Sequence, residues 1–465
     1  YPSGLPADSI SAAGERTNYT SPTNIGAYLW STLAARDLHL ITAAEACARI
    51  SQTLQTLAGM ERHTTSGQFY NWYDTTTGAK LTTWPPTGEP LYPFLSSVDN
   101  AWLATALIMV MNGLPQLRQQ AAALLEPMNF GFYYDADSGL LRGGYWPEPP
   151  PTGVHVNGYT CHHYGALNTE TRMASYIGIA RGQLPPTHYF KLARACPASR
   201  VDSTPIVQPQ GLWRNYLGVD VWEGCASFQD LRLVPSWGGS MFEALMAPLF
   251  IPEEQWGAQS WGINHPLYVQ AQMLLGMVEA GYGYWGFSPA NNPSGGYREY
   301  GVAALGMATA GYPSYNDDAW VDEHATAARR GDSQPWLAAR AGVVTPHAVF
   351  LALDFAPEAS LANLDKLRQN FAIYGPWGFW DSVNVATGEV ARFVLALDQG
   401  MILIALGNAL CNNRLQRYFA DNKLEDALRP LLAQEKFTAA STNSLAPDAL
   451  VVEWPLTDYL VTRGK

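Results

Sequence analysis

Residues 97–112 read SVDNAWLATALIMVMN. Apolar side chains fall on almost every side of this stretch when it is drawn as a helix, instead of forming a single stripe. A helix that is apolar all round is buried within its protein. The pattern therefore predicts an inner helix that other helices enclose.

Signals for helices recur on both sides of this stretch. Ser21-Pro22 places a capping residue before a proline at the first helical position. Thr42 and Glu45 have the spacing of a capping box. Both patterns predict the start of a helix. Further helices are predicted over 115–126, 167–181, 239–249, 265–280, 298–310, 345–355, 357–371, 395–411 and 424–434.

Long connections rich in Gly, Pro, Trp and Tyr separate the predicted helices. Such loops rarely persist in a compact domain unless they are functional. Alternating strand patterns are short and scattered, so we expect only small β-hairpins. A helical solenoid would show internal repeats at a fixed period, and this sequence has none. We predict an all-α fold, an (α/α)6 toroidal barrel with long loops and small β-hairpins at one mouth, as a single domain over residues 1–465.

Composition limits the partners of the chain. It has 465 residues, of which 47% are hydrophobic, so it is long enough to bury a large core. A formal net charge of −12 argues against nucleic acid or an anionic membrane as a partner. No apolar run reaches the length of a membrane span. The low share of charged residues and a start at Tyr1 without Met lead us to expect a secreted or periplasmic protein, and we expect a monomer.

The aromatic content is high, with 16 Trp and 24 Tyr. Flat apolar rings stack on the faces of sugars, so this content is compatible with an oligo- or polysaccharide substrate. The alternative is that these rings belong to the core, which is the more frequent role of any single aromatic residue.

Indications of a metal are weak. His162-His163 has no Cys, Asp or Glu at a spacing that completes a zinc site. The acidic group within 317–323 is not framed by a calcium-binding loop. The five cysteines have no metal-binding spacing, and Cys196 with Cys225 is the expected disulfide pair. We therefore expect no metal ligands.

The remaining candidates for chemistry are carboxylates near aromatic residues. Hydrolysis of a glycosidic bond needs two carboxyl groups, one to protonate the leaving oxygen and one to activate water or attack carbon. Glu170, Glu243 and Asp398 lie in or at the start of apolar helices, where a carboxylate is costly unless it is paired or used. Asp74 and Asp99 are further candidates. A structural ion pair or a helix cap is the alternative role for each.

Eight segments also carry a family resemblance. They are TSPTNIGAYLWSTLAARDL at 20–38, FYNWYDTTTG at 69–78, SSVDN at 96–100, NTETRMASYIGIARGQLPPTHYFKLAR at 168–194, WGGSMFEALM at 237–246, WGI at 261–263, VVTPHAVFLAL at 343–353 and LDQGMILIALGNAL at 397–410. In this collinear order they resemble the glycoamylase-like domain. That domain occurs in bacterial endo-β-1,2-glucanases (glycoside hydrolase family 144) and in the transglycosylase part of cyclic β-1,2-glucan synthases.

The resemblance implies an (α/α)6 barrel that acts on β-1,2-glucan without a metal or other cofactor. It places Glu170 on the general acid of the inverting glucanases, which is the nucleophile of the retaining synthase. It places Asp398 on the general base, where the synthase has His-His-Gln-Gly. The synthase acid/base Glu is replaced here by His265. The resemblance therefore predicts an inverting, endo-acting hydrolase whose base reaches water through a substrate hydroxyl.

Further residues are expected to bind the sugar chain. Asp74, Asp99, Asn100 and Glu243 are predicted to bond hydroxyl groups, and Gln399 is predicted to position water or a hydroxyl. The predicted stacking residues are Trp72, Tyr73, Tyr164, Trp237, Trp261, Phe379 and Trp380.

Two residues near the acid have alternative roles. Arg172 is expected either to lower the pKa of Glu170 after product leaves or to pair with a neighbouring Asp. His265 is expected either to contact substrate or to be a histidine at a helix start. Residues 146–166 resemble an insertion just before Glu170 that could reshape one end of the cleft.

Rival functions remain at this point. One is an exo-acting or differently specific glucan hydrolase, a transglycosylase or a phosphorylase on the same fold. Another is a non-catalytic glucan-binding protein, although such a protein has no need of both Glu170 and Asp398. The expected products are sophoro-oligosaccharides.

Overall fold

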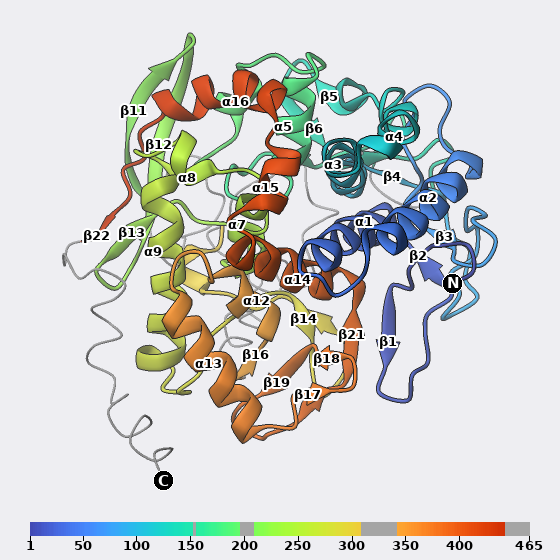
Figure 1. The fold of residues 1–465 in the computed structure, drawn as a ribbon. Coiled ribbons are helices and arrows are strands. Elements are labelled where there is room, and N and C mark those ends of the chain that lie inside the picture. The colour runs from blue at the N-terminus through green and yellow to red at the C-terminus, as the bar shows by residue number, and fades with distance from the viewer. Residues whose placement is uncertain (152–154, 196–208, 308–341, 442–465) are drawn as a thin grey trace.

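The computed structural model describes residues 1–151, 155–195, 209–307 and 342–441. Helices α1, α3 and α14 cross the middle of the molecule, and most of the strands lie nearer its edges (Figure 1). The helices are α1 (Pro22–Asp37), α2 (Ala43–Gly59), α3 (Ser97–Gly113), α4 (Arg118–Leu125), α5 (Arg172–Ala180), α6 (His188–Lys191), α7 (Met241–Leu245), α8 (Glu253–Trp256), α9 (Trp261–Leu274), α12 (Pro346–Leu351), α13 (Pro357–Asn370), α14 (Ala396–Leu410), α15 (Arg414–Phe419) and α16 (Asn422–Gln434).

The helix starts follow the capping signals in the sequence. The side chain of Ser21 accepts a hydrogen bond from the main-chain N–H of Asn24 at the start of α1. Thr42 accepts one from the N–H of Glu45 at the start of α2. These bonds satisfy main-chain donors that the first turn of a helix leaves unpaired. Both predicted starts are confirmed.

Helix α3 is the buried helix that its sequence predicts. It packs against α1, α4, α5 and α15. Helix α1 approaches it closely at Gly26, where an added Cβ would lie 2.8 Å from the carbonyl oxygen of Trp102. The apolar surface around α3 is therefore covered by helices on several sides.

The packing partners of the inner helices form a closed series. Helix α1 packs against α3 and α14, α3 against α5, and α12 against both α7 and α14. Arg172 at the start of α5 donates hydrogen bonds to the carbonyl oxygens of Glu243 and Ala244 in α7, which joins these two helices. Helices α2, α13 and α16 pack against α1, α12 and α5 respectively. The result is a helix-rich fold with helices on more than one layer.

The strands form small antiparallel sheets between the helices. They are β1 (Ser9–Ser11), β2 (Tyr19–Thr20), β3 (Tyr73–Asp74), β4 (Leu95–Ser96), β5 (Tyr134–Asp135), β6 (Leu140–Arg142), β7 (Gly144–Tyr145), β8 (His155–Val156), β9 (Tyr159–Thr160), β10 (His163–Tyr164), β11 (Gln210–Tyr216), β12 (Val219–Phe228), β13 (Leu231–Leu233), β14 (Ala290–Asn291), β15 (Tyr297–Arg298), β16 (Val343–Val344), β17 (Tyr374–Gly375), β18 (Gly378–Phe379), β19 (Ser382–Asn384), β20 (Val390–Ala391), β21 (Phe393–Leu395) and β22 (Ala440–Ser441). The small hairpins that we predicted are thus present.

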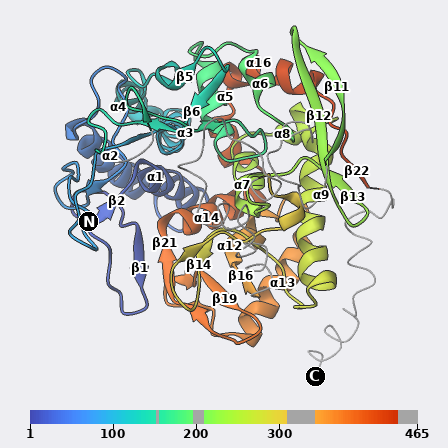
Figure 2. The ribbon, with the colours of Figure 1, turned by 180° about the vertical axis from the view of Figure 1, so that it is seen from behind.

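Two regions differ from the sequence prediction. The connection between the helices predicted over 167–181 and 239–249 contains the long hairpin β11–β12, whose tip projects at the edge of the molecule in Figure 2, so the fold is not purely α-helical. The prediction of a helix over 298–310 is wrong for the described residues up to 307, which contain the end of β15 and a single 3-10 turn. Gly295 and Gly296 adopt positive φ there and turn the chain into the hairpin β14–β15.

Segments near the start of the chain pack against residues 393–400. Strand β1 pairs with β21, with Ser9 opposite Leu395. Trp30 of α1 donates its indole N–H to the carbonyl oxygen of Gly400 in α14 at 3.1 Å. One hydrophobic cluster includes buried residues from Leu5 to Ala439.

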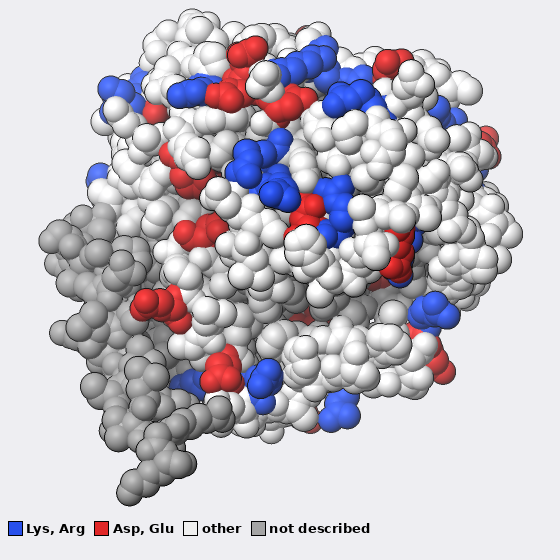
Figure 3. Space-filling view, in the orientation of Figure 1, with Lys and Arg blue, Asp and Glu red and all other residues white. Residues whose placement is uncertain are grey.

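Other features of the prediction concern the surface and the cysteines. On the face shown in Figure 3, the described residues place acidic and basic side chains among one another. Within the described ranges, none of the helices has the length and apolarity needed to cross a membrane. Cys225 is buried on β12. Its predicted partner Cys196 and the acidic group within 317–323 lie outside the described residues.

Candidate active site

Glu170 lies in the turn before α5, within reach of an indole donor and a second carboxyl group. Trp102 donates its indole N–H to Oε2 of Glu170 at 2.5 Å. The main-chain N–H of Glu170 donates to Oε2 of Glu243 at 3.1 Å. Desolvation raises the pKa of Glu170 well above its ordinary value, and the charge of Glu243 raises it further. Glu170 therefore carries a proton near neutral pH, as a general acid must.

Glu243 comes from the first turn of α7 and is also desolvated. Burial raises its pKa to about 7, although the hydrogen bond from the N–H of Glu170 and the charge of Arg172 lower it. Two carboxyl groups in one weakly hydrated site do not ionise independently. Glu170 and Glu243 therefore hold at least one proton between them near neutral pH.

These two carboxyl groups line a small cavity of about 100 Å³. Tyr164 and Trp237, both predicted to stack on sugar, lie in its wall together with His162. The segment predicted as an insertion thus contributes directly to the wall beside Glu170. The structure brings Tyr164, Trp237 and Glu243 together with the predicted acid.

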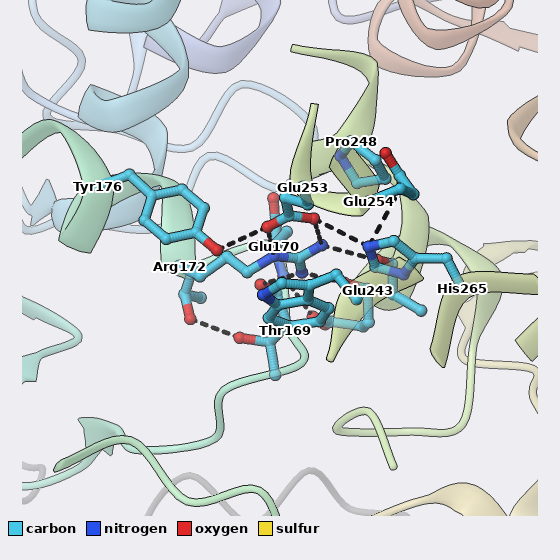
Figure 4. A network of polar contacts seen from close by, with 12 residues as sticks. Thr169, Glu170, Arg172, Tyr176, Glu243, Pro248, Glu253, Glu254 and His265 are labelled. Atoms are coloured by element: carbon cyan, nitrogen blue, oxygen red, sulfur yellow. Dashed lines mark hydrogen bonds and ion pairs between the residues drawn. The ribbon is translucent and has the colours of Figure 1, made fainter. Parts of the chain in front are cut away.

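Arg172 is directed away from the carboxyl group of Glu170 (Figure 4). Its guanidinium bonds both carboxylate oxygens of Glu253, at 2.8 and 2.9 Å. It also donates to the carbonyl oxygens of Thr169, Glu243 and Ala244. One buried cation therefore ties together the two segments that carry the carboxyl groups of the cavity.

Glu253 is an acidic partner that the sequence analysis did not select. Burial alone would raise its pKa, but Arg172 and His265 hold that pKa at about 2. Tyr176 donates its hydroxyl to Oε1 of Glu253 at 2.6 Å. Nε2 of His265 lies 3.0 Å from Oε2. Glu253 is therefore a fixed anion at the centre of the network in Figure 4.

A second carboxyl site surrounds Asp398 in the first turn of α14. Nδ1 of His347 lies 3.2 Å from Oδ2 of Asp398 and 2.8 Å from the hydroxyl oxygen of Thr345. The hydroxyl hydrogen of Thr345 is donated to the carbonyl oxygen of Asp381, so His347 must donate its Nδ1–H. Desolvation lowers the pKa of His347 to about 4. His347 is therefore neutral near neutral pH, donates its Nδ1–H to Thr345 and packs against Asp398.

Asp381 forms a carboxyl pair with Asp398. Burial raises the pKa of Asp398 to about 6, and the hydrogen bond with Asp381 lowers it. Burial and the charge of Asp398 raise the pKa of Asp381 well above its ordinary value. The shared proton therefore stays on Asp381, which leaves Asp398 ionised above about pH 6. Oδ2 of Asp381 accepts two hydrogen bonds from Asn291, which fix its orientation.

His347, Asp381 and Asp398 are also the described residues that could hold a metal ion. Their potential ligand atoms lie within 4.8 Å of one another. The three buried side chains can hold either a proton shared by the two carboxyl groups or a cation.

Tyr297 lies within electrostatic range of both carboxyl sites. The charges of Asp398, Asp381 and Glu170 all act to raise the pKa of its hydroxyl. Tyr297 is opposite Asn291 in the hairpin β14–β15, and Asn291 is bonded to Asp381. The residue is 56% exposed. Tyr297 is therefore accessible to a ligand and lies within electrostatic range of both carboxyl sites.

Comparisons with known proteins concern the family and the fold of the chain. Residues 202–423 match the family model Glycoamylase, described as "Putative glucoamylase". The chain carries a glycoamylase-like domain. Residues 3–131 match a second family model, described as a protein of unknown function.

The glycoamylase-like chain is homologous to a much longer protein. It is 31% identical over 335 residues to the cyclic β-(1,2)-glucan synthase NdvB of Rhizobium meliloti (strain 1021). The match covers 69% of this chain and 9% of that synthase, so the chain spans less than a tenth of the curated relative.

Solved structures share the fold at low sequence identity. A "putative glucoamylase" from Bacteroides caccae ATCC 43185 superposes with a TM-score of 0.64 and 17% identity, over 95% of this chain and 94% of that chain. An endo-β-1,2-glucanase from Chitinophaga pinensis, in complex with sophorotriose and glucose, gives a TM-score of 0.62 and 14% identity, over 92% of both chains. These likenesses show the fold, and with the family model they support the expectation of a glycoside hydrolase.

Several predicted site residues of the glycoamylase-like domain lie inside its core instead. Trp261 and His265 are fully buried on α9, where their rings stack at 5.0 Å. Tyr73 is fully buried and donates its hydroxyl to the carbonyl oxygen of Glu61. These three residues are buried, as is Arg172, so none of them is placed to contact a sugar.

Two residues that were predicted to bind sugar hydroxyls instead form hydrogen bonds with the main chain. The amide of Asn100 bonds the main chain of Phe69 and Ser96 and has no exposed surface. Oδ1 of Asp74 accepts three hydrogen bonds from Thr76 and Thr77 in a tight turn. Sequence alone did not separate these local structural roles from sugar binding.

The remaining predicted residues lie at the edges of the two sites. Asp99 accepts a hydrogen bond from Thr23 at 2.6 Å, and its charge raises the pKa of Glu170. Gln399, the residue after Asp398, donates a side-chain hydrogen bond to the carbonyl oxygen of Phe379. Trp380 is mostly buried against Gly375. Trp72 packs against Trp84.

Proposed function

We propose that this chain is an inverting glycoside hydrolase that cleaves β-1,2-glucan internally and releases sophoro-oligosaccharides. The observation that carries the proposal is the opposite protonation of two desolvated carboxyl groups. Glu170 is held protonated by burial and by Glu243, whereas Asp398 is ionised above about pH 6 beside a protonated Asp381. Hydrolysis with inversion requires one carboxyl group that donates a proton and another that accepts one.

In the proposed reaction, Glu170 gives its proton to the glycosidic oxygen as the bond to the anomeric carbon breaks. Asp398 accepts a proton from the attacking water. In the family that the sequence resembles, this transfer passes through a substrate hydroxyl, and we propose the same route here. The indole of Trp102 donates a hydrogen bond to Glu170, and Nδ1 of His347, bonded to Thr345, lies 3.2 Å from Asp398.

The surroundings of His265 support inversion over retention. The retaining relatives have a Glu acid/base at this position, and here the histidine is buried and bonded to Glu253. It has no path to a glycosidic oxygen. A transglycosylase that needs a second carboxyl group at this position is therefore disfavoured.

The substrate is proposed from the relatives. The homologous synthase is named for β-1,2-glucan, and the Chitinophaga pinensis glucanase of the same fold holds sophorotriose and glucose. We further propose a single (α/α)6 barrel, in which α1, α3, α5, α7, α12 and α14 are the inner helices. Endo action, a monomeric state and a secreted or periplasmic location belong to the same proposal.

Proton NMR of linear β-1,2-glucan with the enzyme tests the proposal. Early signals of α-anomeric reducing ends are expected, and they disappear in Glu170→Gln and Asp398→Asn. Early β-anomers would overturn the role given to Asp398. A requirement for phosphate would indicate a phosphorylase. Binding of the glucan with no new reducing ends would indicate a binding protein.

A further inference from the structure

A second cavity, outside the two carboxyl sites, is lined mainly by aromatic rings. Its volume is about 240 Å³, and Trp72, Tyr92, Phe94 and Trp146 lie in its wall. The rings of Phe94 and Trp146 are 4.4 Å apart, so these two side chains form one continuous apolar surface. Tyr92 is 38% exposed, which leaves the cavity open to solvent.

The N-terminal turn of α3 connects this cavity to the predicted acid. Asn71 lies in the cavity wall, and its side-chain amide can bond both Oδ2 of Asp99 at 2.8 Å and the indole N–H of Trp72 at 3.2 Å. Trp102 follows Asp99 by one helical turn and lies on the same side of α3. Its indole N–H is bonded to Glu170. One turn of helix therefore separates the aromatic cavity from Glu170.

The segment that resembles an insertion gives a second connection. Trp146, directly after β7, lines the aromatic cavity, whereas Tyr164 at the end of β10 lines the cavity of Glu170. Strand β7 pairs with β9 at Tyr145 and Tyr159, which holds the two parts of the segment together. One segment therefore lines both cavities.

The lining defines the chemistry of a ligand. The described residues in the wall include no Asp, Glu, Lys or Arg, so a charged ligand would find no counter-ion there. Several rings supply flat apolar surfaces, and the Asn71 amide and the tyrosine hydroxyls supply hydrogen-bonding groups. A neutral pyranose has the matching combination of apolar faces and hydroxyl groups.

We propose that the aromatic cavity binds a glucosyl unit of the substrate chain at a distance from the bond that is cleaved. This inference rests on the proposed function and adds a dependence on chain length. A chain long enough to reach from Glu170 past α3 to Trp146 gains an additional contact. Shorter chains occupy the carboxyl site alone.

The test is the cleavage of linear β-1,2-linked gluco-oligosaccharides of increasing length by Trp146→Ala. We expect the KM for long chains to rise roughly tenfold, with kcat unchanged and with no change for the shortest chain that is cleaved. Tyr92→Ala is a second variant at a more exposed position. Trp213→Ala is the matched control, because Trp213 is a 58% exposed tryptophan on the distant strand β11.

The outcomes separate this inference from the proposed function. Two outcomes would overturn the aromatic subsite and leave the proposed function intact. In one, both variants hydrolyse the sugars with the wild-type KM. In the other, KM rises by the same factor for sugars of every length. If the wild-type chain cleaves none of these sugars, the proposed function fails. Titration of tryptophan fluorescence with the same sugars then tests the subsite. Weaker binding in Tyr92→Ala, with unchanged binding in Trp213→Ala, supports the subsite. Equal binding in the two variants, or no binding at all, overturns it.

Discussion

Arg172 and Glu253 form a doubly hydrogen-bonded ion pair that has no exposed surface. Nε of Arg172 lies 2.8 Å from Oε1 of Glu253, and Nη2 lies 2.9 Å from Oε2. The remaining guanidinium hydrogens bond the main chain around Glu170 and Glu243. The pair therefore acts on the carboxyl cavity in two ways: through the backbone, and through the charge of Arg172, which lowers the pKa of Glu170 and of Glu243.

Glu253→Gln is expected to destabilise the protein by about 3–5 kcal/mol, because it leaves the Arg172 cation buried without its counter-ion. The free energy of unfolding in urea measures the effect. Glu425→Gln is the matched control, since Glu425 forms an ion pair with Arg429 at 2.6 Å on the exposed side of α16. That change is expected to cost less than about 1 kcal/mol. Equal losses in the two variants would contradict a buried, uncompensated cation.

Asp381→Ala is expected to shift the acidic limb of the kcat/KM profile to higher pH. The hydrogen bond from Asp381 lowers the pKa of Asp398, which is about 6, so its loss raises that pKa. The base is then ionised only at higher pH, and activity at pH 5 falls more than activity at pH 8. Asp381→Asn keeps a donor in place and should shift the limb much less. An unchanged acidic limb in both variants would show that Asp381 does not control the base.

Tyr297→Phe is expected to lower kcat/KM about tenfold, equivalent to ~1.4 kcal/mol, because it removes one accessible hydroxyl within electrostatic range of both carboxyl sites. Stability should be unchanged, since the residue is 56% exposed. Tyr374→Phe, which alters a 54% exposed tyrosine on β17, is the control for loss of a surface hydroxyl. Equal kcat/KM values in the two variants would place Tyr297 outside the substrate path.

Glu243→Gln is expected to change how stability depends on pH. The folded-state pKa of Glu243 is about 7, above the ordinary value of 4.5. Between these values the unfolded chain releases the proton first, so the free energy of unfolding of the wild type falls as pH rises. Gln lacks this effect, and the variant should gain about 1–3 kcal/mol relative to wild type between pH 4.5 and 7. A difference that is constant with pH would contradict the raised pKa.

Helix α3 and the two principal carboxyl groups could be predicted because each has a local signal. Apolar side chains around every face of residues 97–112 leave burial as the stable arrangement. Glu170 and Asp398 share with Glu243 a place at the start of an apolar helix, where a carboxylate is costly without a use, and the family resemblance singled out the first two. Hairpin β11–β12 was missed because the surrounding stretch is rich in turn signals. Its alternation, with Val219 and Val221 buried around Asp220, was visible in the sequence.

The partners of the carboxyl groups could not be predicted, because they are tertiary contacts. Glu253 begins α8, where an acidic residue has an ordinary role at a helix N-terminus. Asp381 follows Trp380 in a loop, and only folding brings it to Asp398. Trp237 lines a cavity and Trp261 lies in the core, although both stand in similar aromatic surroundings in the sequence. Burial of a ring depends on the packing of the whole fold.

The contact between α1 and α14 has a consequence for synthesis on the ribosome. These helices lie at residues 22–37 and 396–410, and the indole of Trp30 is bonded to Gly400. A nascent chain therefore exposes one apolar side of α1 until almost all of the fold has been made. Contacts between such distant segments slow folding and prolong the exposure of aggregation-prone surface. The proposed base, Asp398 on α14, is among the last functional groups to arrive, so premature termination leaves a chain that holds the proposed acid Glu170 without it.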